Sequence, residues 1–250
     1  MKRVKYRAAV DDDPLEGFRE AVLGWYDQHG RNLPWRRTRD PYAIIVSEIM
    51  LHQTTVATVA PVYEEFMQRF PTVQALHEAA LEEVKAITDP LGYKVRGRWL
   101  KDIARAVVEE RGGIWPDSVE ELMTLPGVGR YTAGAVASFA LGIDAPILDT
   151  NVKRVLGRYF GIDYKNSRAE TQHVLWALAE AVVPEGQASR FNQALMDFGA
   201  MLCTARKPLC LLCPARVHCQ SGGVEAGQAA EAPFTYRLLP RDEESSDSAS

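Results

Sequence analysis

Apolar residues recur at helical spacing along most of this chain. In the first such stretch, Leu15, Phe18, Val22 and Trp25 fall on one face of a helix over residues 14–28, because positions three and four apart share a face. The same spacing predicts further helices over residues 42–53, 55–70, 72–88, 95–111, 131–141, 151–160, 168–183 and 188–203. No alternating pattern of useful length predicts a strand, so the expected fold class is all-α.

A glycine turn interrupts the helical pattern near the middle of the chain. The segment Leu125–Arg130 contains Gly127 and Gly129 and precedes the helix over residues 131–141. Glycine adopts backbone torsions closed to other residues. The first N–H groups of a helix have no partner within it, so this turn is typical of a phosphate-binding site. An ordinary turn between two packed helices is the structural alternative.

Composition and charge exclude few partners. The chain has 250 residues and is 46% hydrophobic, which is enough apolar material for a globular core. Its net charge is −4. The tail from Ser221 to Ser250 holds six acidic and two basic residues, so the remainder has 29 − 2 = 27 basic and 33 − 6 = 27 acidic residues. Basic residues cluster at residues 31–39, at residues 94–101 and around Arg206, and each cluster predicts either a phosphate contact or a solvated face.

The two ends of the chain differ in composition from its body. Residues 1–13 carry no apolar run typical of a secretory signal, and no stretch has the roughly 18 apolar residues of a membrane span. We therefore expect a soluble, cytoplasmic protein, associated with the nucleoid in a bacterium or archaeon. Residues 1–13 are expected to be flexible and residues 221–250 to form a disordered acidic tail, within which residues 234–239 resemble a short docking segment.

Four cysteines lie in one short segment, Cys203, Cys210, Cys213 and Cys219, with gaps of six, two and five residues. A cytoplasmic chain does not keep such thiols as disulfides, so shared metal ligation is the simplest explanation. Tetrahedral thiolate ligation admits either zinc or an iron–sulfur cluster. The six-residue gap favours a group wider than one zinc ion, although the spacing leaves both open.

The glycine turn, the later Asp149 and the cysteines occur in the order typical of helix-hairpin-helix DNA glycosylases with an iron–sulfur cluster, and residues 14–220 resemble that family. The resemblance implies one 4Fe-4S cluster. It implies a six-helix barrel domain over residues 40–145 and a cluster domain over residues 14–39 and 146–220. It also implies a monomer that holds double-stranded DNA with a mispaired or damaged base across the cleft between these domains.

Within this family the chain is most similar to MutY-type adenine glycosylases. The similarity lies in Ser47–Thr54, Ile147–Arg154, Phe191–Ala194 and Leu33–Arg36. Tyr131 stands where endonuclease III-like members carry a nucleophilic lysine, which argues against efficient lyase activity.

The chain also departs from the MutY-type pattern. His52 replaces a glutamine, Lys94 replaces a tyrosine used as a wedge at the opposite base, and the chain ends without the C-terminal domain with which many relatives recognise oxoguanine. Thymine mismatch glycosylases share residues 39–42, Tyr131, Asp149 and a similar segment over residues 196–203, and they are the alternative.

The resemblance implies a division of work between two acids. Glu48 shares a helix face with Ile44 and Ile45, and an apolar setting raises a carboxyl pKa, so Glu48 is the expected general acid. Asp149, beside helix N–H groups and Asn151, is expected to stay ionised and to stabilise an oxocarbenium-like sugar. Tyr131 is expected to support that charge or a covalent sugar intermediate. A helix-capping aspartate and a salt-bridged glutamate are the structural alternatives.

Further residues are expected at the DNA, because a base is reached only after rotation out of the stack. The resemblance suggests Gln53 and Leu51 as the residues that fill the gap, although Leu51 also fits an apolar core. Gln193 both donates and accepts hydrogen bonds, which suits adenine, and Arg36 has a carboxylate partner as its alternative. The full set is Trp35, Arg36, Leu51, Gln53, Lys94, Gly127, Gly129, Arg130 and Gln193.

The sequence therefore predicts a monofunctional glycosylase that hydrolyses the N-glycosidic bond of an adenine mispaired with oxoguanine or guanine. A glycosylase for thymine or uracil opposite guanine is the second hypothesis. A non-catalytic DNA-binding module with a structural zinc is the third.

Overall fold

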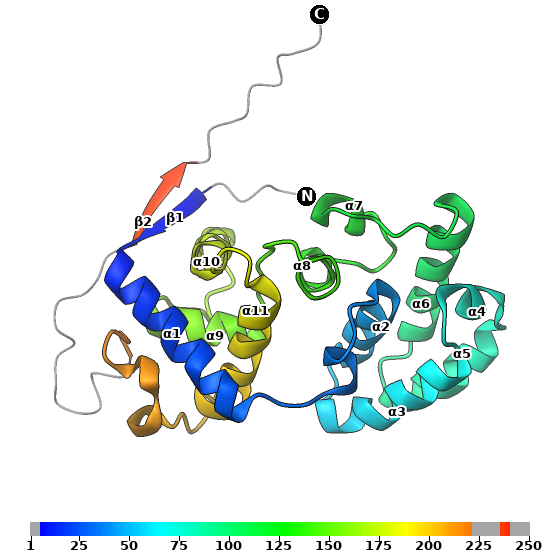
Figure 1. The fold of residues 1–250 in the computed structure, drawn as a ribbon, viewed down its shortest axis with the longest axis horizontal. Helices are drawn as coiled ribbons and strands as arrows, with labels where there is room; N and C mark the ends of the chain where they lie inside the picture. The colour runs from blue at the N-terminus through cyan, green and yellow to red at the C-terminus, as the bar shows by residue number, and fades with distance from the viewer. Residues whose placement is uncertain (1–5, 222–235, 241–250) are drawn as a thin grey trace, which may run out of the picture. The chain divides into compact units, whose positions relative to one another are not determined.

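The structure is a computed structural model that describes residues 6–221 and 236–240 (Figure 1). The chain divides into two compact units. The terminal unit comprises Met1–Gly30, Leu148–Pro184 and Gln193–Ser250, and the central unit comprises Arg31–Ile147 and Glu185–Asn192. The assignment of the predicted barrel and cluster domains to these units stays a prediction.

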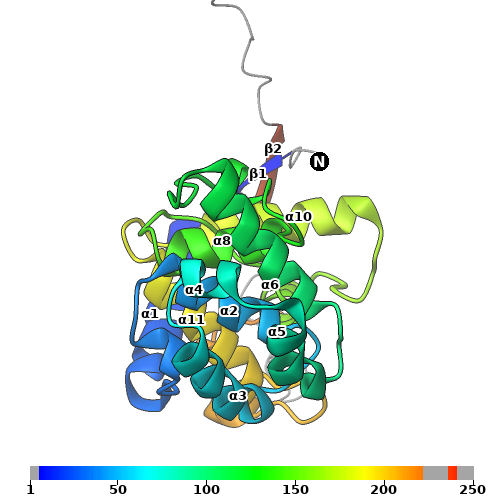
Figure 2. The same ribbon diagram turned by 90° about the vertical axis from the view of Figure 1, so that its right-hand side faces the viewer.

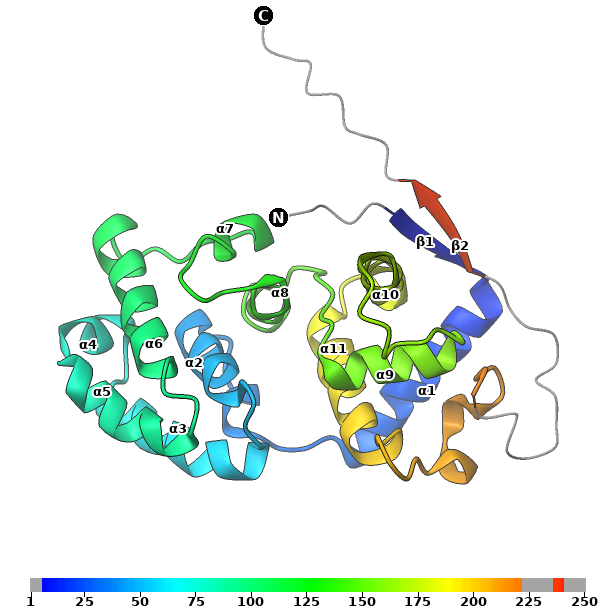
Figure 3. The ribbon, with the colours of Figure 1, turned by 180° about the vertical axis from the view of Figure 1, so that it is seen from behind.

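The central unit is built around α2 (Pro41–Leu51), which is buried on every side from Tyr42 to Met50. Such a helix has no polar face and must lie inside its unit. It packs against α3, α6 and α8, and α5 packs along α6 (Figures 2 and 3). The other elements are η1 (Pro34–Arg36), α3 (Val56–Arg69), α4 (Val73–Glu78), α5 (Leu81–Thr88), η2 (Asp89–Leu91), α6 (Arg96–Arg105), η3 (Ala106–Glu110), α7 (Val119–Leu122) and α8 (Arg130–Phe139).

The helix expected over residues 72–88 is two helices, α4 and α5. The chain leaves the helical conformation at Ala79 and Ala80, and the Ala80 N–H donates to Glu83 Oε2 at 3.1 Å. Lys101 donates to the carbonyl oxygens that α4 leaves without helical partners, those of Leu76, His77 and Ala79, at 2.6–3.0 Å. These three long-range hydrogen bonds from Lys101 replace the missing helical bonds. Apolar spacing alone does not reveal them.

The terminal unit contains α1 (Asp12–His29), α9 (Thr150–Tyr159) and α10 (Ala169–Val182). It also contains most of the helical elements that follow α10 in the chain. These are α11 (Ala188–Asp197), which begins in the central unit, and η4 (Phe198–Leu202), η5 (Cys210–Leu212) and η6 (Pro214–Arg216). Phe18 of α1 lies 4.3 Å from Tyr159 between ring centroids, and the Tyr159 hydroxyl donates to the Pro14 carbonyl at 2.8 Å. The N-terminal helix α1 and helix α9 therefore share one core.

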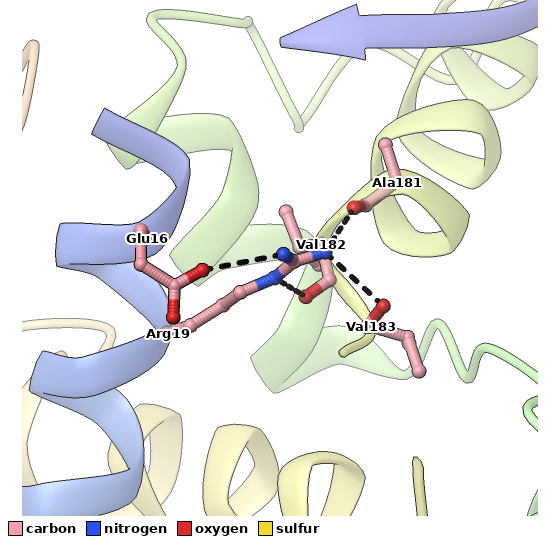
Figure 4. A network of polar contacts seen from close by, with 5 residues as sticks. All are labelled: Glu16, Arg19, Ala181, Val182 and Val183. Carbon is pink, nitrogen blue, oxygen red and sulfur yellow. Dashed lines mark hydrogen bonds and ion pairs between the residues drawn. The ribbon is translucent and has the colours of Figure 1, made fainter. Parts of the chain in front are cut away.

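Arg19 joins α1 to the end of α10 (Figure 4). Its guanidinium donates to the carbonyl oxygens of Ala181, Val182 and Val183 at 3.0–3.2 Å, and it pairs with Glu16 at 3.4 Å. The last carbonyls of a helix lack intrahelical partners and carry its negative dipole end, so a cation is stabilising there. One side chain thus fixes two helices that lie more than 160 residues apart in sequence.

A two-stranded antiparallel sheet corrects the expectation that the chain has no strand. β1 (Tyr6–Val10) pairs with β2 (Tyr236–Pro240), in the register Tyr6↔Pro240 to Val10↔Tyr236. β1 packs against α10. Each strand has only five residues and its partner lies at the other end of the chain, so local alternation gives no usable signal.

The sheet places part of both chain ends in the fold. β1 lies inside residues 1–13, which were expected to be flexible, and β2 overlaps the expected docking segment 234–239. Residues 1–5, 222–235 and 241–250 lie outside the described residues. Within the described ranges, the other helices begin and end close to their predicted bounds, and the fold is mostly helical as predicted. No helix there is long and apolar enough to cross a membrane.

Candidate functional site

The glycine turn of the central unit leads directly into α8. Gly127 has φ +74°, and a Cβ there would lie 2.8 Å from the Trp99 ring, so only glycine fits. Gly129 is the N-cap of α8 and has open space around it, and it offers no side-chain cap to the helix N–H groups. The turn is therefore tightly packed on the Trp99 side and open at the helix N-terminus, which is the arrangement that binds anions. Arg130, the first residue of α8, is half-buried.

Glu48 and Tyr131 lie on the contacting helices α2 and α8 of the central unit. Glu48 is 2% exposed within the apolar helix α2, as the sequence predicted for an acid in apolar surroundings. Tyr131 is half-buried in the first turn of α8. Glu48 is therefore not one of the solvent-exposed glutamates that are usual on helix surfaces.

The loop that follows α2 carries an unusual backbone conformation at Gln53. Its φ is +57°, the sole positive φ outside glycine among residues 6–221 and 236–240, and its side chain is exposed. Non-glycine residues adopt this conformation where the surroundings enforce it, often at functional sites. Leu51 is half-buried rather than part of the core, and Lys94, in the loop between η2 and α6, is exposed.

Two members of the basic cluster 94–101 are structural. Arg96 is fully buried and Lys101 donates to the end of α4. His52 lies against Trp99, with ring centroids 5.9 Å apart, and its Nε2 lies 3.4 Å from Thr132 Oγ1. Burial, followed by the charge of Arg96, lowers the pKa of His52. The cluster therefore offers fewer phosphate contacts than its composition indicates.

The segment around η1 is more buried than a base-binding surface requires. The Trp35 ring is 5% exposed and contacts Tyr63 edge to face at 5.3 Å. Arg36 is half-buried and donates to the Arg31 carbonyl at 3.1 Å. Trp35 therefore contributes to the core of the central unit, whatever it contacts in a complex.

Asp149 of the terminal unit caps α9. Its Oδ1 accepts from the Val152 N–H at 2.7 Å, and its Oδ2 accepts from Asn151 Nδ2 at 3.1 Å. Burial raises the pKa of Asp149, while these donors and the charge of Arg154 lower it, and burial dominates. The sequence predicted an ionised aspartate beside helix N–H groups. The donors are present, but desolvation shifts the pKa in the opposite direction.

A buried arginine connects Asp149 to the first cysteine. Arg154 is 5% exposed and donates to Asn151 Oδ1 at 2.7 Å, to the Gly199 carbonyl at 2.7 Å and to the Cys203 carbonyl at 2.8 Å. Asn151 in turn donates to Asp149. Sequence reasoning missed this role, although the i,i+3 spacing of Asn151 and Arg154 on a predicted helix was a usable signal.

Gln193 has a partner that the sequence analysis did not identify. The Tyr26 hydroxyl of α1 donates to Gln193 Oε1 at 3.1 Å, and both side chains are half-buried. This contact fixes which end of the amide accepts. Tyr26 lies four residues after Val22 on the same side of α1, and its polar tip was the available signal.

The four cysteines line one pocket of the terminal unit. The other lining residues are Arg158, Leu202, Pro208, Leu209, Arg216 and Ser221. Arg158 Nη1 lies 3.4 Å from Cys203 Sγ, and burial raises the pKa of the Cys213 thiol to about 12. Among the described residues, no three His, Cys, Asp or Glu side chains converge tightly enough to hold a single metal ion.

The sequence is similar to two groups of curated proteins. It is 46% identical over 225 residues to the adenine DNA glycosylase of Homo sapiens, covering 86% of this chain and 41% of the human protein. It is 41% identical to the thymine/uracil-DNA glycosylase of Pyrobaculum aerophilum, covering 79% of this chain and 87% of that protein. The chain spans about half the length of the adenine glycosylases it matches.

The fold is similar to two solved structures. A thermostable thymine-DNA glycosylase matches with a TM-score of 0.79 and 35% identity, over 84% of this chain and 97% of that one. A trapped endonuclease III–DNA covalent intermediate matches with a TM-score of 0.74 and 25% identity, over 87% of this chain and all of that one. A profile described as HhH-GPD superfamily base excision DNA repair protein matches residues 46–181, which include Glu48, the glycine turn and Asp149. The chain belongs to the HhH-GPD superfamily of base excision DNA repair proteins.

Proposed function

We propose that this protein is a monofunctional DNA glycosylase that removes adenine mispaired with oxoguanine or guanine. The observation that carries the proposal is the setting of Asp149, whose carboxylate is held at the N-terminus of α9 by Val152 and Asn151. A fixed carboxylate of this kind stabilises positive charge that develops on a sugar. The similarity to adenine DNA glycosylases over most of the chain supports adenine as the base removed.

The chemistry divides between the two acids. Glu48, buried in α2, favours the protonated form and donates a proton to the departing purine. Asp149 stabilises the oxocarbenium-like sugar, and Asn151 holds its Oδ2 in place. Tyr131 supports the charged sugar, and its hydroxyl is a far weaker nucleophile than a lysine amine, so a lyase step is not expected. Water then forms a bond to the sugar carbon, and the proton that it loses restores the Glu48 carboxyl group.

Gln193 supplies the contact that favours adenine. An amide pairs with adenine through one donor and one acceptor. Tyr26 donates to Gln193 Oε1, so the amide is already oriented, and a carbonyl oxygen retains a second lone pair. The donor and the remaining acceptor lone pair are what an adenine edge requires.

A thymine or uracil glycosylase is the second candidate. The observation in its favour is coverage, because the chain matches 87% of the Pyrobaculum protein but only 41% of the human adenine glycosylase. The two candidates share the role of Asp149 and differ in the base that Gln193 accepts. A non-catalytic DNA-binding module is the third hypothesis.

Double-stranded DNA is the proposed partner, and a monomer in the cytoplasm or nucleoid is the proposed state. Support comes from the open N-terminus of α8 after Gly129, which suits a backbone phosphate. Gln53, with its enforced backbone conformation, is the proposed side chain that fills the gap left by the base.

The four cysteines are proposed to hold one 4Fe-4S cluster. All four line the same pocket and all are soft sulfur donors, a set that suits iron–sulfur clusters. Thiols spread around a pocket fit a multi-atom group better than one zinc ion. When bound, the cluster supplies a rigid anchor for the chain between residues 203 and 219. A brown protein with visible absorbance and about four irons per chain supports this assignment, and stoichiometric zinc rejects it.

The function is tested on duplex oligonucleotides that each carry one mispair. Strand cleavage after alkali is measured for adenine opposite oxoguanine, adenine opposite guanine, thymine opposite guanine and uracil opposite guanine. Cleavage confined to the adenine strand supports the proposal. Cleavage confined to thymine or uracil transfers the function to the second candidate, and duplex binding without any base release leaves the third.

A further inference from the structure

One buried side chain, Arg96, joins two loops of the central unit. Its guanidinium is 0% exposed. Nε donates to the Ile49 carbonyl and Nη1 to the Tyr93 carbonyl, both at 3.2 Å, and Nη2 donates to the His52 carbonyl and to Thr54 Oγ1. Three of the four acceptors lie at or just after the end of α2, and the fourth lies before α6.

These contacts set the conformation of the loop after α2. The last carbonyls of a helix have no helical partners, and Arg96 donates N–H groups to two carbonyl oxygens at this end of α2, those of Ile49 and His52. The chain therefore turns sharply after Leu51, and Gln53 takes its left-handed conformation between two residues that Arg96 binds, His52 and Thr54. A strained conformation of this kind persists where the surroundings determine it.

The same side chain also fixes the loop before α6. Arg96 donates to the Tyr93 carbonyl, and its guanidinium carbon lies 5.5 Å from the centroid of the Tyr93 ring. Thr54 Oγ1 lies 3.3 Å from the Leu91 carbonyl, so the two loops also touch directly. Exposed Gln53 and exposed Lys94 are thus presented by two loops with one common anchor.

We propose that Arg96 is a positioning residue for base extrusion, because it sets the placement of Gln53 and Lys94 from within the core. The inference rests on the proposed function. Arg96 is fully buried and contacts no DNA, so its effect is indirect. The side chains that enter the duplex must be placed to within a fraction of an ångström, and a misplacement of about 1 Å costs on the order of 10²-fold in rate.

The chain offers a matched control in Lys101. It is also a cation that donates to three backbone carbonyls in the central unit, those of Leu76, His77 and Ala79, but these lie at the end of α4 and in neither loop. Arg96→Met and Lys101→Met each remove one such cation. Arg96→Lys keeps the charge but lacks the planar fork that reaches both loops.

Two measurements separate positioning from general destabilisation. The first is the single-turnover rate of base release from adenine opposite oxoguanine and from adenine opposite an abasic analogue, where extrusion breaks no base pair. Arg96→Met is expected to lower the first rate by about 10²-fold and the second by much less, while Lys101→Met leaves both near wild type. The second is the fluorescence of 2-aminopurine at the target position, whose rise on binding reports unstacking and is expected to be lost in Arg96→Met.

The outcomes are decisive. The proposal is wrong if Arg96→Met loses the same factor in rate on both duplexes, or if it keeps the 2-aminopurine fluorescence rise. It is also wrong if Lys101→Met loses as much rate as Arg96→Met. If Arg96→Met does not fold, the same comparison is made with Arg96→Lys. A wild-type protein that releases no base rejects the proposed function instead, and the fluorescence comparison still tests Arg96 by itself.

Discussion

The two candidate acids, one in each unit, show how the fold gives one chemical group two different surroundings. Glu48 lies in the middle of a helix buried on every side, at 2% exposure. Asp149 stands at a helix N-terminus, where Val152 and Asn151 donate to both of its oxygens. The first setting surrounds the carboxyl group with apolar residues, and the second supplies donors that favour the anion.

The comparison shows that hydrogen-bond donors are not the only influence on the charge of Asp149. Burial still raises the pKa of Asp149, and Arg154 opposes this shift from within the same network. Four predictions test the comparison, from the largest expected effect to the smallest.

Asp149→Asn removes the charge and keeps the shape of the cap. We expect the single-turnover rate of base release to fall by about 10³-fold, the size of one preorganised electrostatic contact, while duplex affinity stays within about twofold. Rates from rapid-quench assays and affinities from fluorescence anisotropy check this. Unchanged turnover would show that the two acids do not differ in the way described.

Glu48→Gln replaces the proposed proton donor with a neutral amide of similar shape. We expect a loss of about 10²-fold or more, typical of a general acid. The loss should shrink on a substrate whose leaving base needs no protonation, which single-turnover assays on modified purines measure. A loss that is the same for every leaving base would assign Glu48 a structural role.

Arg154→Met tests whether the surroundings of Asp149 depend on the cysteine segment. The substitution removes donors to Asn151, Gly199 and Cys203. We expect base release to fall by at least about 10-fold, because losing one charged hydrogen-bond donor costs about 1.5 kcal/mol or more. The exposed Lys207, replaced by Met, is the control. If Arg154→Met loses its visible absorbance but keeps full activity, the Asp149 site does not depend on the cysteine segment, and the prediction is wrong.

The pH dependence of stability gives the smallest effect. The folded-state pKa of Asp149 is raised, so the folded protein holds this proton more tightly than the unfolded chain does. The contribution of this group is therefore full below the unfolded pKa of about 3.9 and is lost as pH rises through the folded pKa. We expect Asp149→Asn to melt at a higher temperature than wild type at pH 8, with the difference shrinking towards pH 4. A difference independent of pH would contradict the raised pKa.

The sequence predicted those features that depend on neighbours along the chain. Helical periodicity placed α2 and α9, and a cap residue followed by helix N–H groups placed Asp149. The break between α4 and α5 and the pairing of β1 with β2 escaped prediction, because Lys101 and the opposite chain end act from a distance. The sequence also identified the four cysteines as one group, and they line one pocket.

Tertiary structure alone decided how the candidate residues are held. Arg96 and Trp99 carry no local signal of their roles, yet they bind the loop of Gln53 and pack against Gly127. Arg154 and Tyr26 carry polar groups that the sequence shows, but only the fold shows that they bind Asn151 and Gln193. Their partners lie from three to 167 residues away in sequence. A guanidinium or hydroxyl reveals which group it serves only when folding brings that group within hydrogen-bonding distance. The sequence therefore determined which groups are present, and the packing of the helices determined the orientation and the surroundings of each.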